Sequence, residues 1–215
     1  MIQDKPRALD LFCGAGGATR GLQQAGFHVT GVDINPQPRY CGDVFIQADA
    51  LTIDVSGYEL VWSSPPCQHY SRASACRPGL KATYPDLVEP TRNLLRAKAS
   101  AWVIENVPGA PLINPIRLCG AMFGRPLYRH RLFETSLPIP EPAHVKHLVK
   151  CSRAGHWKPG TYVCVAGNCA PIALAREAMG VAWTTRRELA ESIPPVFSEY
   201  IGRQFLAILA QHPNL

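Results

Sequence analysis

The chain has 215 residues, of which 47% are hydrophobic and 18% charged, proportions typical of a globular domain and not of a disordered chain. Lysine and arginine outnumber aspartate and glutamate by 22 to 16, which permits a polyanionic partner, although the basic residues form no block. No apolar run approaches the ~18–20 residues that span a bilayer, and the first residues lack a signal peptide's apolar stretch. We therefore expect no membrane association, a cytoplasmic location and mostly reduced cysteines.

The N-terminal segment predicts a strand at residues 8–12, a glycine turn at 13–17 and a helix at 18–25. A second predicted strand, at residues 29–32, ends in Asp33. The order strand, glycine turn, helix, strand and acid is the beginning of a Rossmann-like βαβ unit.

The glycine turn contains Gly14, Gly16 and Gly17, which would let the backbone approach a ligand closely. A dinucleotide fingerprint would need a further glycine where the chain has Thr19, and no Walker lysine follows. NAD and ATP are both disfavoured. A turn without any cofactor role remains the alternative.

Further along, strands are predicted at residues 44–48, 59–62 and 101–104, with a helix at 90–101 before the last of them. This alternation predicts an α/β fold with a Rossmann-like, mainly parallel sheet and helices on both faces.

The alternation fails from about residue 136 to 180, apart from a helix-like stretch at 174–179. A helical pattern returns at 198–209 and should pack back on the core. We therefore predict a catalytic and cofactor-binding domain at 1–137, a small irregular insert at 138–180 and a returning C-terminal segment at 181–215.

Two acids follow predicted strands, Asp33 after the second and Asp49 after the third. An acid in the first position can accept both hydroxyls of a ribose, and one in the second could accept from an exocyclic amine. Each could instead be an ordinary helix cap or turn residue. Together with the glycine turn, they predict a pocket for a nucleoside-like cofactor.

Cys67 follows a buried strand and two prolines, which would place its thiol on a stiff loop at the sheet edge. Glu105 ends the next predicted strand and could stay protonated in a partly apolar setting. Beside a flat heteroaromatic ring, the pair suggests attack at carbon with protonation at a ring nitrogen. The alternatives are a structural cysteine and a polar strand end.

Five ordered motifs carry a resemblance: residues 10–17 (DLFCGAGG), 65–68 (PPCQ), 105–107 (ENV), 129–131 (RHR), and Ser192-Ile193 before Tyr200-Ile201-Gly202. In this order they resemble the S-adenosylmethionine-dependent DNA (cytosine-5) methyltransferases. The resemblance covers about residues 8–135 and 180–210 and indicates a compact, phage-like or restriction-modification member in a bacterial or phage-infected cell.

The resemblance implies a class I methyltransferase fold and methyl transfer to C5 of cytosine. Cys67 would add to C6, Glu105 would engage N3, and Arg129 and Arg131 would hold the base or the Cys67 loop. The cofactor pocket would be lined by Phe12, Gly14, Gly16, Gly17, Asp33, Ile34, Asp49, Pro66 and Ser192.

The segment between Arg131 and Ser192, where that family places its target-recognition domain, has only about sixty residues. We therefore expect short sequence specificity, a helper chain or a smaller substrate. RNA and a free cytosine nucleotide remain alternatives to DNA, and a non-catalytic nucleic-acid-binding module is a second alternative. Zinc could stabilise this segment through four candidate ligands, although their spacing fits no standard zinc motif: Cys151, His156, Cys164 and Cys169.

Overall fold

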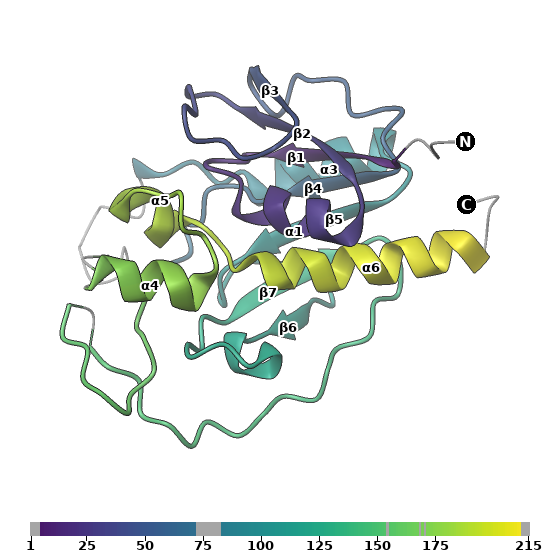
Figure 1. Cartoon of the computed structure of the whole chain (residues 1–215). Helices are drawn as coiled ribbons and strands as arrows, with labels where there is room; N and C mark the ends of the chain where they lie inside the picture. Colours follow the sequence, from purple (N-terminus) through teal and green to yellow (C-terminus); the bar gives the residue numbers. More distant parts are fainter. Residues whose placement is uncertain (1–4, 72–82, 154, 168, 170, 212–215) are drawn as a thin grey trace.

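The structure is a computed structural model that describes residues 5–71, 83–153, 155–167, 169 and 171–211. Its described strands form one seven-stranded sheet in the order β3-β2-β1-β4-β5-β7-β6 (Figure 1). The strands are β1 (Arg7–Leu11), β2 (His28–Asp33), β3 (Val44–Gln47), β4 (Leu60–Ser63), β5 (Trp102–Asn106), β6 (Ile116–Leu118) and β7 (Arg131–Thr135). Strands β1 to β5 are parallel, and β7 runs antiparallel to both β5 and β6. The predicted mainly parallel α/β fold is confirmed.

Helices cover both faces of the sheet, with α1 (Gly17–Ala25) and α6 (Pro195–Gln211) on one face and α3 (Val88–Lys98) on the other (Figure 1). Alternate strand residues supply the two cores. In β4, Trp62 packs with the α1 and α6 side chains, whereas its neighbour Val61 packs with Leu95 of α3. This period of two is what a sheet buried on both faces requires.

Helices α1 and α6 approach so closely that only glycine fits at their crossing. A Cβ added at Gly21 would lie 1.9 Å from the Pro195 carbonyl oxygen. The Ser198 hydroxyl donates to the Ala18 carbonyl oxygen at 2.7 Å. Helix α6 therefore packs directly against α1 on this face of the sheet.

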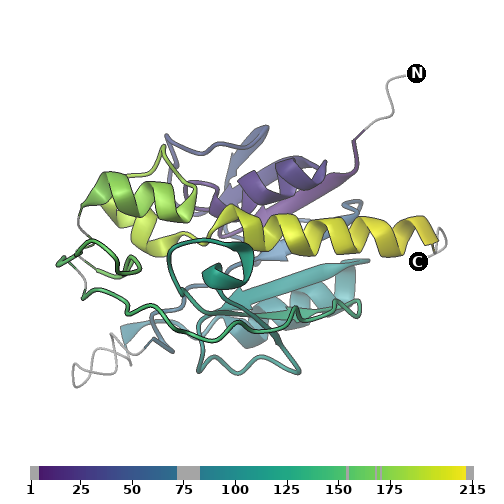
Figure 2. The same cartoon turned by 60° about the horizontal axis from the view of Figure 1, so that its bottom comes forward.

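After β7 the chain runs as a long loop toward α4 (Ile172–Met179) and α5 (Arg186–Glu191), which lie beyond the carboxyl ends of the parallel strands (Figures 1 and 2). A third hydrophobic cluster joins this region; it includes Val163 and Val165 from the loop, Met179 from α4 and Leu189 from α5. The cluster crosses the boundary that we predicted between residues 180 and 181, so the insert shares a small core with the following segment.

Four elements were not predicted: β6, the 3-10 helix η2 (Gly120–Phe123), β7 and α5. Strand β6 has three residues and α5 six, too short for a periodic pattern to be distinguished. None of the described helices is long and apolar enough to cross a membrane.

Candidate active site

The loop that carries Cys67 follows β4 and is tied to the strands on both sides. The Ser64 N–H donates to the Leu11 carbonyl of β1 at 3.1 Å. The Asn106 side-chain amide, at the end of β5, donates to the Pro65 carbonyl at 2.9 Å and is 1% exposed. Cys67 itself is half-buried. These contacts hold the thiol at the carboxyl edge of the sheet, as the strand-proline pattern predicts.

Glu105 is buried on β5 and pairs with Arg131, whose Nε lies 3.0 Å from Glu105 Oε1. The antiparallel direction of β7 explains this pairing. Because β7 runs opposite to β5, its first residue, Arg131, lies beside the last residues of β5. The structure thus brings Arg131 and Glu105 together at the edge that carries Cys67.

The charges of these groups act on one another. Burial raises the pKa of the Glu105 carboxyl, and the positive charge of Arg131 opposes that rise. Burial also raises the pKa of the Cys67 thiol; the Glu105 charge raises it further, while Arg131 and Arg129 lower it. Thiol ionisation at Cys67 therefore depends on the balance between one carboxyl group and two guanidinium groups.

Arg129 connects the site to the later part of the chain. Its terminal nitrogens donate to the carbonyl oxygens of Val165 at 2.6 Å, Ala190 at 2.6 Å and Ser192. Burial lowers the pKa of its guanidinium to about 9, and the charge of Arg131 contributes to the shift. Arg129 therefore ties the insert and the α5–α6 connector to the Cys67 end of the sheet.

The glycine turn lies at the carboxyl end of β1, next to Asp33 at the end of β2. Asp33 Oδ2 accepts the Gly14 N–H at 3.0 Å, and Oδ1 accepts the Asn35 N–H at 2.9 Å. Phe12 and Gly14 both have positive φ, 59° and 51°. A Cβ added at Gly14 would meet nothing within 4 Å, so open space adjoins the backbone there.

The remaining predicted pocket residues lie in the glycine turn or beyond the carboxyl ends of β2, β3 and β4, apart from Ser192, which precedes α6. Gly16 caps the start of α1, and a Cβ at Gly17 would lie 3.1 Å from Ser192 Cβ. Ile34 is 66% exposed directly after β2. Asp49 is exposed after β3 and accepts the Leu51 N–H, and Pro66 is half-buried beside Cys67.

Two further buried polar residues, Asp10 and Asn106, belong to the site and are not among the residues that the sequence predicts for it. Asp10, on β1 beneath the glycine turn, accepts the Thr19 hydroxyl at 2.5 Å, and its other oxygen has no hydrogen-bond partner. Burial raises the pKa of Asp10 to about 7. The sequence does mark Asp10 as unusual, because it is a charged residue between apolar residues of a strand and such residues are rarely buried without a partner.

Of the four predicted zinc ligands, Cys151 and Cys164 lie close enough to interact, but no three of the four bring their donor atoms within 4.8 Å of one another. In the part of the chain that the structure describes, the only group of metal-ligating side chains whose donor atoms all lie within 4.8 Å of one another is Cys119, His130, His144 and His147.

Comparison with protein families gives one match: residues 7–113 match the family described as C-5 cytosine-specific DNA methylase. The matched segment includes the glycine turn, the Cys67 loop and Glu105. No curated protein sequence matches the chain significantly.

Solved structures with the same fold include methyltransferases that align with this chain over nearly the whole of both chains. A protein described as a DNA modification methyltransferase, encoded within an E. coli prophage, has a TM-score of 0.65 and 14% identity, with 97% of this chain and 100% of that chain covered. The Dnmt2 methyltransferase of S. pombe has a TM-score of 0.62 and 15% identity, covering 95% and 99%. The Entamoeba histolytica methyltransferase EhMeth has a TM-score of 0.61 and 13% identity, with 96% of this chain and 99% of that chain covered. At these identities the likeness establishes the class I methyltransferase fold.

Proposed function

Because the chain belongs to the family of C-5 cytosine-specific DNA methylases, we propose that it transfers a methyl group from S-adenosylmethionine to C5 of cytosine in DNA. The observation that carries the proposal is the Glu105–Arg131 ion pair, placed at the sheet edge where its charges act on the Cys67 thiol. A thiol whose ionisation responds to a neighbouring carboxyl group and neighbouring guanidinium cations is a candidate nucleophile.

The residues around the glycine turn fit S-adenosylmethionine. The space beside Gly14 is open, and the side chain of any larger residue would occupy it. This space lies next to the Asp33 carboxylate, so part of the cofactor could bind there. Each Asp33 oxygen accepts one backbone N–H and keeps a lone pair that a ribose hydroxyl could use. The exposed Ile34 offers an apolar surface for a purine ring. When bound, the cofactor supplies an electrophilic methyl group.

Cys67 begins the proposed reaction. Its thiolate forms a bond to C6 of cytosine, and the C5–C6 π electrons move so that C5 becomes nucleophilic. Glu105 donates a hydrogen bond or proton at N3 and so stabilises the charge that the ring acquires. Because burial raises the pKa of Glu105, its carboxylate takes up a proton more readily than an exposed glutamate does, which suits this role.

After methylation of C5, loss of the C5 proton and cleavage of the Cys67–C6 bond restore the aromatic ring. Arg131 holds the Glu105 carboxyl group in position through its 3.0 Å contact. Arg129 fixes the backbone that surrounds the site through its hydrogen bonds to the insert, to α5 and to the connector after α5.

A cytosine inside a duplex is out of reach of a thiolate, so the proposal requires the base to be flipped out, at a cost of a few kcal/mol. We propose that the insert, residues 138–180, contacts the DNA around the flipped base. Because this insert is short and has little regular structure, we expect it to read few base pairs.

The experiment that tests the function compares substrates. Radiolabelled S-adenosylmethionine is incubated with duplex DNA, tRNA or dCMP, and the label should appear in the DNA at cytosine C5. Label in tRNA or dCMP instead would show that the protein carries out the same reaction on that substrate. Label in none would support the non-catalytic binding module.

Covalent trapping tests the nucleophile independently. Duplex DNA containing 5-fluorocytosine should form a stable adduct with the protein, because fluorine at C5 blocks the final elimination. Mass spectrometry should place the adduct on Cys67, and Cys67→Ser should form none while still binding the cofactor. An adduct on another residue would refute the mechanism.

A further inference from the structure

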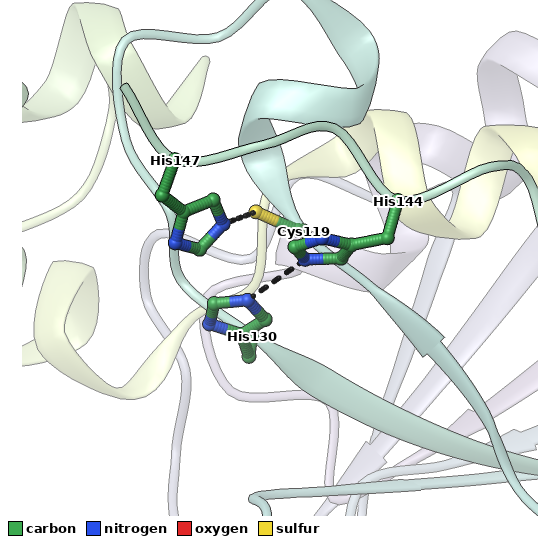
Figure 3. Close-up of side chains that lie close together, drawn as sticks. All are labelled: Cys119, His130, His144 and His147. Atoms are coloured by element: carbon green, nitrogen blue, oxygen red, sulfur yellow. Dashed lines mark hydrogen bonds between the residues drawn. The ribbon is translucent and has the colours of Figure 1, made fainter. Parts of the chain in front are cut away.

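Four side chains outside the proposed active site converge from distant parts of the chain (Figure 3). Cys119 follows β6, His130 precedes β7, and His144 and His147 lie on the long loop after β7. Their donor atoms all lie within 4.8 Å of one another. Two pairs are closer, with Cys119 Sγ 3.4 Å from His147 Nε2 and His130 Nε2 3.1 Å from His144 Nε2.

The two shorter separations are close to those of a tetrahedral site. Zinc bonds of ~2.3 Å to sulfur and ~2.0–2.1 Å to nitrogen place neighbouring ligand atoms about 3.3–3.7 Å apart. Two of the separations are already within about 0.3 Å of that range. The remaining pairs lie within 4.8 Å, and the exposed His144 side chain has room to move toward the other ligands.

The surroundings support the same arrangement. Cys119 is fully buried, and its sulfur accepts the Met122 backbone N–H at the start of η2. Such hydrogen bonds orient and stabilise a metal-bound thiolate. The His147 ring stacks on Tyr128, with ring centroids 3.6 Å apart and planes inclined by 16°. Two of the ligands are therefore positioned by neighbours that are not themselves ligands.

We propose that Cys119, His130, His144 and His147 bind one Zn²⁺ ion. One thiolate and three imidazoles complete four-coordination and leave no open position, which is the pattern of a structural site. The ion would fasten the loop at residues 144–147 to the ends of β6 and β7. Because His130 lies between Arg129 and Arg131, the ion would also fix the backbone that carries both arginines.

Metal analysis of the purified protein tests the proposal without any assay of activity. We expect about one zinc per chain, and cobalt substitution should give the intense visible absorption of a tetrahedral site with a thiolate ligand. Absence of bound metal after exposure to zinc would overturn the proposal, as would a cobalt spectrum typical of octahedral coordination.

Variants locate the site. His144→Ala and His147→Ala change exposed side chains, so the fold should persist, yet the double variant should bind less than about 0.2 zinc per chain. His156→Ala is the matched control, because it removes a histidine of the same irregular region that lies outside the group, and it should keep the full metal content. Retention of zinc in the double variant would overturn the proposal, and so would its loss in His156→Ala.

Chelation adds a second readout. A strong chelator should lower the melting temperature of the unmodified protein and of His156→Ala, but not that of the double variant, because only a bound ion contributes linked stability. Equal effects of the chelator on all three proteins would contradict the site.

Discussion

Asn106 donates its side-chain N–H to the Pro65 carbonyl at 2.9 Å, so the end of β5 holds the loop that presents Cys67. The same side chain accepts the Val107 N–H through Oδ1 at 2.9 Å, so both ends of the amide are used. The residue next to the proposed acid therefore positions the proposed nucleophile.

Asn106→Ala should lower kcat by about 10- to 100-fold, because small displacements of a reacting group are costly. It should also cost about 1–3 kcal/mol of stability by leaving the Pro65 carbonyl unpaired. Cofactor affinity should not change. Asn93→Ala, on the exposed face of α3, is the control. Steady-state kinetics with calorimetry of cofactor binding measure both effects, and a kcat equal to that of the control would exclude the positioning role.

Glu105→Gln should abolish proton donation and lower methylation by about 10²–10⁴-fold. The same change removes a negative charge that raises the pKa of Cys67, so the thiol should ionise at a lower pH. Conversely, Arg131→Gln should move its ionisation to a higher pH. The pH dependence of iodoacetamide alkylation at Cys67 measures these shifts.

Arg187→Gln is the control for this series, because Arg187 is 88% exposed and pairs only with Glu191 among the ion pairs of the described residues. It should leave the alkylation profile unchanged. Shifts of the same sign in Glu105→Gln and Arg131→Gln would contradict the electrostatic account of the site.

Gly14→Ala should weaken cofactor binding at least about 10-fold, because the new methyl group would enter the open space beside the glycine turn. Its φ of 51° also imposes a backbone cost of about 1–2 kcal/mol. Gly160→Ala is a matched control, since Gly160 has a φ of 77° and also meets nothing within 4 Å. Calorimetry should show weaker binding for Gly14→Ala alone; equal affinities would place the cofactor elsewhere.

Asp10 should make the protein less stable as pH rises. Burial raises its pKa from 3.8 to about 7, so the folded state binds this proton more tightly than the unfolded state. The resulting stabilisation is complete below about pH 4 and is lost as pH rises to about 7, roughly 4 kcal/mol in all.

Urea unfolding at a series of pH values should show this slope in the unmodified protein and a smaller one in Asp10→Asn. Asp54→Asn serves as the control, since Asp54 is exposed and its pKa is lowered, not raised. The same slope in Asp10→Asn and the unmodified protein would refute the assignment of the buried proton to Asp10.

The positions of Cys67, Glu105 and Asp33 could be predicted because each follows a strongly apolar strand, and the ends of parallel strands share one edge. The partners of Arg129 could not, because its carbonyl acceptors lie 36 to 63 residues away on segments without periodicity. The convergence of Cys119 with three histidines was missed for a similar reason. These residues meet because β6, η2 and β7 fold next to one another. Strand β6 is too short and η2 too irregular to be recognised from sequence.

The hydrogen bond from Ser198 to Ala18 joins residues 180 positions apart. On the ribosome, therefore, α1 emerges long before the helix that covers it, and Leu22 and Phe27 lack their α6 contacts until α6 has been made. The growing chain should accordingly bind chaperones that hold apolar segments, and release from them should coincide with the synthesis of α6. Ribosome-bound chains stalled before and after residue 195 would show this difference.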